Sequence, residues 1–217
     1  MRLLIGVQAR TNSKRLPAKI HEKIGDFTIL EHVVRAAQRA DAMSNAIEYI
    51  VAVLGPTGDI RLKEECKRIE VDCLLFDKED DVLGRYVQAC EKYQANAVIR
   101  LTADCVDIQT FIIEECAKGL TEADYCSNTI IRSYREGWDC QGCSRKALKW
   151  FDVKSIEREH VFSEFEANEK VRKDFIDFGY TLRHILNKDN ELLKKTSIDT
   201  KEDLERARQM YGNELAR

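Results

Sequence analysis

The sequence predicts an α/β fold built on a central, mostly parallel β-sheet. Short apolar runs at Leu3–Gln8 and Tyr49–Val53 are separated by a segment, Ile29–Ala40, in which apolar residues recur at helical spacing. This alternation is typical of right-handed crossovers between parallel strands, which leave helices on both faces of the sheet. Ligands of such sheets bind beyond the carboxyl ends of the strands, so the functional site is expected at that edge.

The same two patterns continue along the chain. Apolar and β-branched runs predict further strands at Val71–Phe76, Ala97–Leu101, Asp124–Asn128, Tyr180–Leu186 and Thr196–Ile198. Helical spacing predicts helices at Asp59–Arg68, Val82–Tyr93, Gln109–Leu120, Ile156–Asn168 and Lys201–Tyr211. Thr200 is suited to cap the last helix, and Glu202 and Asp203 in its first turn suit the helix dipole.

The composition indicates a folded chain with one domain over residues 1–217. Hydrophobic residues make up 44% of the chain, with 10 Gly and 2 Pro, which excludes a disordered or low-complexity protein. Lys and Arg number 35 against 38 Asp and Glu, so the net charge of −3 argues against nucleic acid as a partner. One domain is expected because domains run to roughly 100–200 residues.

Apolar stretches are too short for the roughly 20 residues that cross a bilayer. No export signal is visible either, so we expect a cytoplasmic protein with no membrane partner, whose eight cysteines stay reduced. Cys140 and Cys143 form a C-x-x-C motif that leaves open a metal-binding or redox protein. Against it, a zinc site needs four ligands, and two thiols three apart on a strand face opposite sides.

Four cations stand in the loop that follows the first predicted strand. Arg10, Lys14, Arg15 and Lys19 lie within residues 9–19, among small and hydroxylated residues. Cations, short hydroxyls and backbone N–H groups together suit a polyphosphate, although a solvated basic loop has the same composition. Neither a Walker loop nor G-x-G-x-x-G follows the strand.

Acidic residues follow two later predicted strands. Asp104 and Asp107 come after Ala97–Leu101, and Asp199 directly follows Thr196–Ile198. Mg²⁺ takes one or two carboxylates and completes its shell with water and phosphate oxygens. Each acid alone could equally cap a helix, but beside the basic loop they could hold a metal and a triphosphate together.

Several motifs, in order along the chain, belong to one pattern. The basic loop has the form Ala-Arg-x-x-Ser-x-Arg-Leu-Pro-x-Lys after Gln8, and further matches stand at residues 81–86, 100–105, 127–128, 137–139, 158–160 and 198–204. Together they resemble the cytidylyltransferases that activate acidic sugars, in particular the spore-coat polysaccharide branch, related to acylneuraminate and 3-deoxy-manno-octulosonate cytidylyltransferases. Relatives often have Gly at Asn12 and Ala18, Pro at Val106, and an acid at Gln141.

The resemblance implies a nucleotide-diphospho-sugar-transferase-like, Rossmann-like domain with a mixed, mostly parallel sheet. It implies transfer of CMP from CTP to an acidic sugar or other small anionic acceptor, with Mg²⁺ as cofactor and pyrophosphate as product. It also implies a homodimer, with the acceptor-side and dimerisation elements in about 124–190.

Site residues are implied by position in the same motifs. The catalytic set is Arg10, Lys19, Asp104 and Asp199, of which Asp104 and Asp199 bind the metal. The nucleotide-binding set is Gln8, Ala9, Arg10, Ser13, Arg15, Lys19, Asp81 and Arg85. The acceptor-binding set is Asn128, Asp139, Gln141, Glu159 and His160.

Two questions stay open at the level of the sequence. A metal-dependent glycosyltransferase would use both Asp104 and Asp107 to hold a nucleotide sugar, whereas the cytidylyltransferase can spare Asp107. His160 is a candidate general base, because histidine accepts a proton near neutral pH, but in a charged helix it could equally be a surface or orienting residue.

Overall fold

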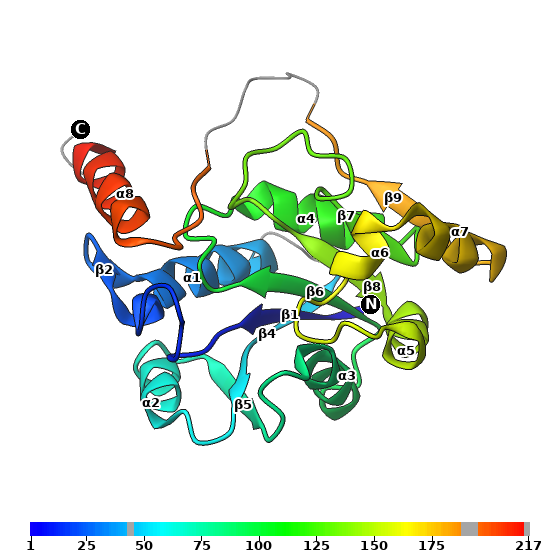
Figure 1. Ribbon diagram of the computed structural model, residues 1–217, viewed down its shortest axis with the longest axis horizontal. Helices are drawn as coiled ribbons and strands as arrows, with labels where there is room; N and C mark the ends of the chain where they lie inside the picture. The colour runs from blue at the N-terminus through cyan, green and yellow to red at the C-terminus, as the bar shows by residue number, and fades with distance from the viewer. Residues whose placement is uncertain (43–45, 188–194, 215–217) are drawn as a thin grey trace.

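A seven-stranded sheet forms the centre of the computed structural model, which describes residues 1–42, 46–187 and 195–214 (Figure 1). Its strands are β1 (Arg2–Gln8), β4 (Glu48–Pro56), β5 (Asp72–Phe76), β6 (Ala97–Thr102), β7 (Tyr125–Ser127), β8 (Gln141–Ser144) and β9 (Leu182–His184). In space they follow the order β5-β4-β1-β6-β8-β7-β9. Only β8 is antiparallel to its neighbours, β6 and β7, so the predicted mixed, mostly parallel sheet is confirmed.

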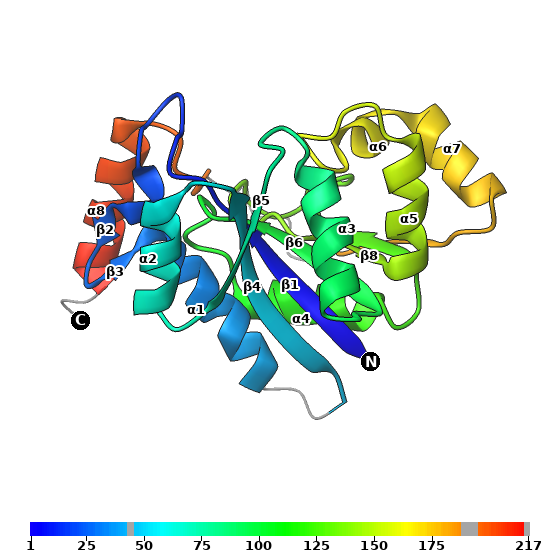
Figure 2. The same cartoon turned by 90° about the horizontal axis from the view of Figure 1, so that it is seen from below.

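Helices cover both faces of the sheet. The first face carries α1 (Ile29–Ala42), α2 (Ile60–Arg68) and α4 (Thr110–Gly119), and the second carries α3 (Val82–Lys92), α5 (Arg145–Lys154), α6 (Ser163–Ala167) and α7 (Glu169–Asp177). Figure 2 shows α1 and α2 on one side of the strands and α3 and α5 on the other. The short helix η1 (Lys19–His21) precedes a hairpin of β2 (Lys23–Ile24) and β3 (Phe27–Thr28), against which α8 (Lys201–Glu214) packs.

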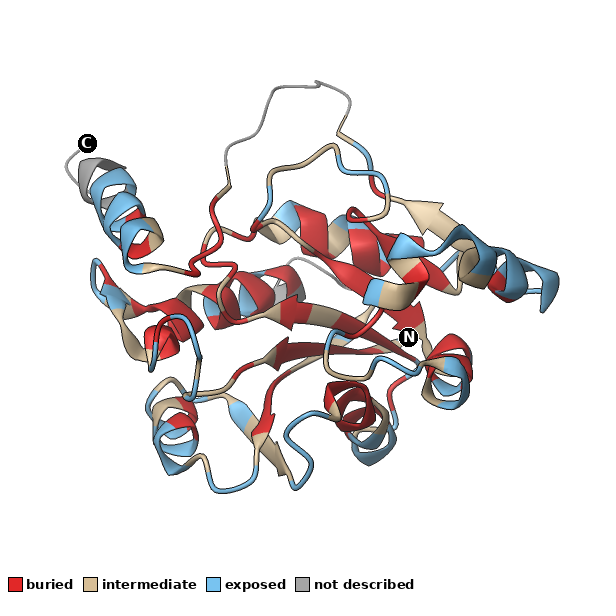
Figure 3. Ribbon diagram, in the orientation of Figure 1, coloured by how far each residue is buried: buried red, intermediate tan, exposed pale blue. Residues whose placement is uncertain are grey.

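Side chains of β1 alternate between the two cores, as a strand requires. Leu3 and Ile5 pack on the α1 side and Leu4 on the α3 side, and all three are fully buried. Figure 3 shows β1 coloured as buried along most of its length. Gly6 also faces α3, where an added Cβ would lie 2.5 Å from the ring of Tyr86. The Tyr86 hydroxyl donates to the Gly6 carbonyl oxygen at 2.9 Å, so the absence of a side chain lets α3 lie close to β1.

Most predicted elements are confirmed with small shifts at their ends, but the helix predicted over 156–168 is wrong in its first half. There α6 begins only at Ser163. The carboxylate of Glu157 accepts the backbone N–H groups of Glu159 and His160 at 2.8 and 3.1 Å, so it draws them into a turn instead of a helix. His160 therefore lies in a loop.

The strand predicted at Thr196–Ile198 is also wrong. The backbone N–H of Thr196 donates to the carbonyl oxygen of Glu136 at 2.7 Å, and that of Ile198 donates to the carbonyl oxygen of Asp104 at 3.1 Å. These single bonds tie the segment across two loops and do not extend the sheet. The α5 and α7 helices, the β8 strand and the β2–β3 hairpin were not predicted.

The cysteines are free thiols, seven buried and one half-buried. Cys140 lies in the core on the α1 side and Cys143 in the core on the α3 side, as their spacing predicted. Thiols on opposite faces of a strand cannot bind one metal ion or pair as a dithiol, so the C-x-x-C motif has a packing role. Among the residues that the structure describes, no helix is long and apolar enough to cross a bilayer.

Candidate active site

A pocket of about 460 Å³ opens at the carboxyl ends of β1 and β6. Its lining includes Gln8, Ala9, Arg10, Ser13, Lys14, Arg15 and Lys19 from β1 and its loop, Arg85 from α3, Arg100, Thr102 and Asp104 from β6 and its turn, and Glu79, Glu159 and His160 from two further loops. The structure thus brings together all of the predicted nucleotide-binding residues except Asp81. It also brings two residues predicted for the acceptor into the same pocket.

The basic loop after β1 is held by a carboxylate of the neighbouring helix. Asp59 caps α2 through the backbone N–H of Leu62 at 3.0 Å, and it accepts both the backbone N–H and the hydroxyl of Thr11, each at 2.7 Å. Further on, Ala18 has a left-handed φ of 58°. That conformation costs a residue with a side chain roughly 1 kcal/mol, and glycine adopts it freely. The resulting turn leads directly into Lys19.

Lys19 joins the two acids that were predicted to bind a metal. Its ammonium Nζ donates to Asp104 Oδ2 at 2.7 Å, to the Ile198 carbonyl oxygen at 2.8 Å, and to Asp199 Oδ1 at 3.4 Å. The side chain of Lys19 is 10% exposed, so its charge is compensated by these carboxylates. Asp104 and Asp199 therefore converge on one position that holds a cation.

Gly137 makes this convergence possible, because the segment before Asp199 passes directly over it. Gly137 has a φ of +104°, and an added Cβ would lie 2.5 Å from the backbone nitrogen of Ser197. Only glycine combines this backbone conformation with such a close approach. Asp199 is thereby brought to the end of β6 although the segment forms no strand.

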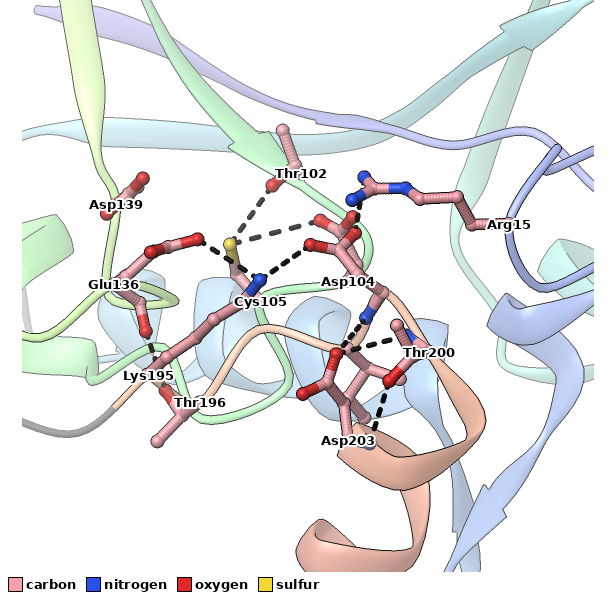
Figure 4. Close-up of polar contacts among 12 residues, drawn as sticks. Arg15, Thr102, Asp104, Cys105, Glu136, Asp139, Lys195, Thr196, Thr200 and Asp203 are labelled. Carbon is pink, nitrogen blue, oxygen red and sulfur yellow. Dashed lines mark hydrogen bonds and ion pairs between the residues drawn. The ribbon is translucent and has the colours of Figure 1, made fainter.

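Asp199 is surrounded by cations. Arg15 Nη2 lies 2.7 Å from Asp199 Oδ1, and Lys195 Nζ lies 2.9 Å from Oδ2. Burial raises the pKa of Asp199, but the hydrogen bond from Lys195 and the charges of Lys19, Lys195 and Arg15 lower it by more. The net result is a pKa below the ordinary value. Lys195 also pairs with Glu136 at 3.4 Å (Figure 4). The carboxylate is therefore ionised at neutral pH.

Asp203 supports Asp199 from the first turn of α8. Its Oδ2 accepts the backbone N–H groups of Asp199 and Thr200, both at 3.0 Å, while the Thr200 hydroxyl accepts the backbone N–H of Asp203 (Figure 4). Burial raises the pKa of Asp203, but these backbone hydrogen bonds and Arg206 bring it down to about 2. This reciprocal cap confirms the predicted start of the last helix.

Asp107 is turned away from this cluster. It accepts a hydrogen bond from Trp138 Nε1 at 2.9 Å and pairs with Arg135 at 3.8 Å. It lines neighbouring hollows of the surface and not the pocket that contains Asp104. The two acids that a metal-dependent glycosyltransferase would need therefore do not face one position.

Arg10 is held between acids on two loops. Its guanidinium pairs with Glu159 at 3.2 Å and with Glu79 at 3.4 Å. The Glu159 loop is anchored in turn by Arg158, whose Nε donates to Asp81 at 2.6 Å. Asp81 also caps α3 through the Gly84 backbone N–H at 2.9 Å. The Asp81 carboxylate thus holds in place both the Glu159 loop and the start of α3, which border the pocket.

Arg85 lies in the pocket wall at 2% exposure. Its Nη2 donates to the carbonyl oxygens of Glu79 at 2.5 Å and Lys78 at 3.4 Å, which fixes the loop before α3. Burial lowers the pKa of this guanidinium, and its Nε has no hydrogen-bond partner among the described residues. A buried polar atom of this kind is suited to an acceptor atom of a ligand.

The other residues predicted for the acceptor, Asn128, Asp139 and Gln141, are not among the lining residues of the pocket. Asn128 is buried and clamps β7 to the approach of β8, with its amide donating to the Trp138 carbonyl oxygen at 2.7 Å and accepting the Cys140 backbone N–H at 2.9 Å. Asp139 pairs with both terminal nitrogens of Arg132 at 2.8 and 3.0 Å. In this arrangement Asn128 shapes the sheet beside the pocket.

Sequence reasoning gave no role to several residues of this site, among them Glu79, Arg100, Arg158 and Lys195. Lys195 had a readable signal, since a lysine four residues before an acid can pair with it locally. Arg100 stands inside a quoted motif. Glu79 carries no such signal, because only the folding of its loop against the basic loop brings it to Arg10.

A model of the cytidylyltransferase family matches residues 4–216. The chain belongs to this family. The uncharacterized protein MJ1063 of Methanocaldococcus jannaschii is 32% identical over 180 residues, which are 81% of this chain and 71% of that protein. The spore coat polysaccharide biosynthesis protein SpsF of Bacillus subtilis is 31% identical over 104 residues, 47% of this chain and 42% of SpsF.

Solved structures share the fold at lower identity. A cytidylyltransferase from Leptospira borgpetersenii superposes with a TM-score of 0.80 at 23% identity, over 97% of this chain and 86% of the other. The CMP:2-keto-3-deoxy-manno-octonic acid synthetase complexed with CTP gives a TM-score of 0.71 at 16% identity, over 99% and 100%. The family expected from the motifs and the nucleotidyltransferase fold are thus confirmed.

Proposed function

We propose that the chain transfers CMP from CTP to a small anionic acceptor, such as an acidic sugar, and releases pyrophosphate. One observation carries the proposal: Lys19 lies between Asp104 and Asp199 in a pocket that also contains Arg10 and Arg15. Cations and carboxylates in alternation suit a triphosphate together with a metal ion.

In this reaction the chain mainly positions the two substrates and stabilises negative charge. An oxygen of the acceptor attacks the α-phosphorus of CTP, and the bond to pyrophosphate breaks on the opposite side. Arg10, Arg15 and Lys19 offset the negative charge that grows on the leaving group. His160, exposed at the edge of the pocket, is the candidate to take the acceptor proton.

The ion pairs of Arg10 are weak enough for a bound triphosphate to replace them. Arg10 and Glu159 are each about one-third exposed in their side chains, and pairs near the surface contribute only about 0–1 kcal/mol. A triphosphate oxygen offers Arg10 a stronger, charge-assisted partner. Binding of CTP would therefore replace Glu159 and Glu79 at this guanidinium.

Asp104 and Asp199 fit a magnesium ion. Their carboxylates and the Ile198 carbonyl are hard oxygen donors that already converge on the Lys19 ammonium. Mg²⁺ usually takes one or two carboxylates and fills its shell with water and phosphate oxygens. When bound, it would supply positive charge to the phosphates of CTP.

Nucleoside contacts would come from β1 and α3. The carboxamide of Gln8 and the buried guanidinium of Arg85 both line the pocket, and amide groups can donate to and accept from a base. Asp81 does not line the pocket, but it would support these contacts by holding Arg158 and the start of α3.

The one-domain organisation and the cytoplasmic location expected from the sequence stay predictions.

The test is pyrophosphate release by the purified protein with each of the four nucleoside triphosphates, Mg²⁺ and a panel of acidic sugars, phosphates and phosphonates. We expect release with CTP and dependence on Mg²⁺, with calorimetry showing CTP bound more tightly than ATP, GTP or UTP. Equal affinity for all four nucleotides would contradict the proposal. Tighter binding of a finished nucleotide sugar than of CTP would favour the glycosyltransferase instead.

We also propose that the chain forms a homodimer through the region 124–190. Four large apolar side chains there are exposed by more than half: Val153 at 81%, Ile156 at 88%, Ile176 at 52% and Phe178 at 66%. Val153 and Phe178 line the same hollow of the surface, and contiguous exposed apolar side chains are typical of an interface. Sedimentation of the wild type should give a dimer, and Ile156→Glu should shift it towards the monomer, while Ile60→Glu on α2 serves as the exposed control.

A further inference from the structure

Arg100 differs from Arg10, Arg15 and Lys19 in the kind of group that holds it. It lies on β6 and lines the pocket, where Arg10, Arg15 and Lys19 are each paired with a carboxylate. Arg100 is held by neutral amides: its Nε donates to Gln8 Oε1 at 3.2 Å, and its Nη1 donates to Gln141 Oε1 at 2.5 Å. Within the described ranges of the chain no carboxylate forms an ion pair with Arg100.

The amide of Gln141 has only one orientation available. Its Nε2 donates to the hydroxyl of Thr129 at 3.4 Å, and that hydroxyl donates its own proton to the carboxylate of Glu166. Tyr125 donates to the same carboxylate oxygen at 2.8 Å. Gln141 is 5% exposed, so both ends of its amide need these partners. Its oxygen therefore points at Arg100.

This arrangement orients a positive charge without neutralising it. An amide oxygen accepts a hydrogen bond from a guanidinium but carries no net charge to cancel the cation. A half-buried guanidinium without a counterion is unfavourable, and an anion that reaches it gains a charge-assisted bond. The Nη2 group makes no hydrogen bond to any described residue, which leaves it for a ligand in the pocket.

The position of Arg100 assigns it to the second substrate. It pairs in register with Gln141 on β8, whereas the cations proposed for the triphosphate lie on the loop after β1 and beside the turn after β6. We propose that Arg100 binds the anionic group of the acceptor, a carboxylate or a phosphate, with Gln8 and Gln141 as positioning residues. This inference rests on the proposed function, since it supposes a second, anionic substrate.

The proposal gives Gln141 a reason to be neutral. A glutamate there would pair with Arg100 and cancel its charge. It would also stand one hydroxyl away from the carboxylate of Glu166, because Thr129 lies between them. In this chain, a glutamate at position 141 is therefore expected to weaken the binding of an anion to Arg100.

The experiment measures binding by calorimetry, with CTP and Mg²⁺ present, of 2-keto-3-deoxy-manno-octonate, its methyl ester and inorganic phosphate. The wild type should bind at least one of the two anions, and the preferred anion tells whether the group is a carboxylate or a phosphate. Arg100→Gln should weaken that anion roughly 100-fold, with CTP affinity within about threefold of wild type. The methyl ester should bind both proteins alike.

Two further variants guard against a merely structural effect. Gln141→Glu keeps Arg100 in place and should weaken the anion by a factor of about 30, whereas Arg100→Lys should restore part of the affinity. Arg2→Gln, at the opposite end of β1 from Gln8, is the matched control and should bind as the wild type does. Melting temperatures of all variants show whether the fold is retained.

The proposal is overturned if neither anion binds the wild type, if Arg100→Gln leaves the bound anion unaffected, or if CTP affinity falls as much as anion affinity. The last result would place Arg100 at the nucleotide. Failure of the proposed function has a separate signature: anions bind through Arg100, yet no acceptor yields pyrophosphate from CTP.

Discussion

The two sides of the pocket treat their cations differently. On the side of the basic loop, Arg15 and Lys19 are paired with the carboxylates of Asp199 and Asp104. On the side of β8, Arg100 is held by the neutral amides of Gln8 and Gln141. Positive and negative charges therefore balance on the first side, whereas the second presents net positive charge to the pocket.

This difference would allow one edge of the sheet to bind the two proposed anionic substrates separately. Paired carboxylates keep a cation-binding position available, and the same carboxylates would repel an anionic acceptor. Amide oxygens orient an arginine without that repulsion. The contrast therefore predicts which residues control the nucleotide and which control the acceptor.

The largest effect is expected at the carboxylates of the first side. Asp104→Asn and Asp199→Asn should each reduce kcat/KM by about 10³-fold, because each removes a charged oxygen donor from the site proposed for the metal ion. Asp107→Asn should lose less than about tenfold, since Asp107 is engaged with Trp138 and Arg135. The measurement is steady-state kinetics on all three variants. If Asp107→Asn lowered kcat/KM as much as the other two substitutions, the result would favour a glycosyltransferase.

Next in size is the contrast between two lysines of the basic loop. Lys19→Ala should reduce kcat/KM roughly 100-fold, because Lys19 bridges both acids, while the exposed Lys14→Ala should lose about threefold. CTP affinity from calorimetry and kinetics on both variants provide the check. Indistinguishable variants would mean that only the summed charge of the loop matters.

A smaller effect should separate the acceptor from the nucleotide. Asp139→Ala and His160→Ala are expected to raise the KM of the acceptor about tenfold and to leave the CTP dissociation constant within a few-fold of wild type. Asp139 is paired with Arg132 outside the pocket lining, whereas His160 lines the pocket itself. If either variant lost CTP affinity instead, the proposed division of the pocket would be wrong at that residue.

The smallest effect concerns a paired acid outside the pocket, which should act on stability alone. Glu31 is buried and accepts hydrogen bonds from Arg35 at 2.9 Å and Arg68 at 2.5 Å. Burial raises the pKa of Glu31, but the hydrogen bonds from Arg68 and Arg35 lower it by more, so the pKa lies below the ordinary 4.5. Glu31→Gln should reduce the free energy of unfolding by about 1–2 kcal/mol at pH 7, without changing kcat/KM.

The pH dependence of this loss has a definite sign. A carboxylate whose pKa is lowered in the folded state stabilises the fold above its ordinary pKa, and that stabilisation disappears as the pH falls through the folded value. Urea unfolding of wild type and Glu31→Gln should therefore differ at pH 7 and converge below pH 4.5. Glu64→Gln, exposed on α2, is the control that should change little at either pH.

The sequence by itself determined the fold class and most of the pocket. Alternating strand and helix patterns depend on local spacing, and a parallel sheet requires its ligand edge at the strand ends. The basic loop is short and contiguous, so its position after β1 already placed Arg10, Arg15 and Lys19 at that edge. Motif order then identified the family.

Only the tertiary structure decided which side chains meet. The chain makes β6, β7 and β8 in that order, but the sheet inserts β8 between the other two, and this places Gln141 beside Arg100. Asp199 reaches Asp104 on a segment that crosses loops and forms no strand, and its contact with Lys19 spans most of the chain. Local spacing cannot encode such contacts, because they depend on how the strands are ordered and on which backbones can approach closely.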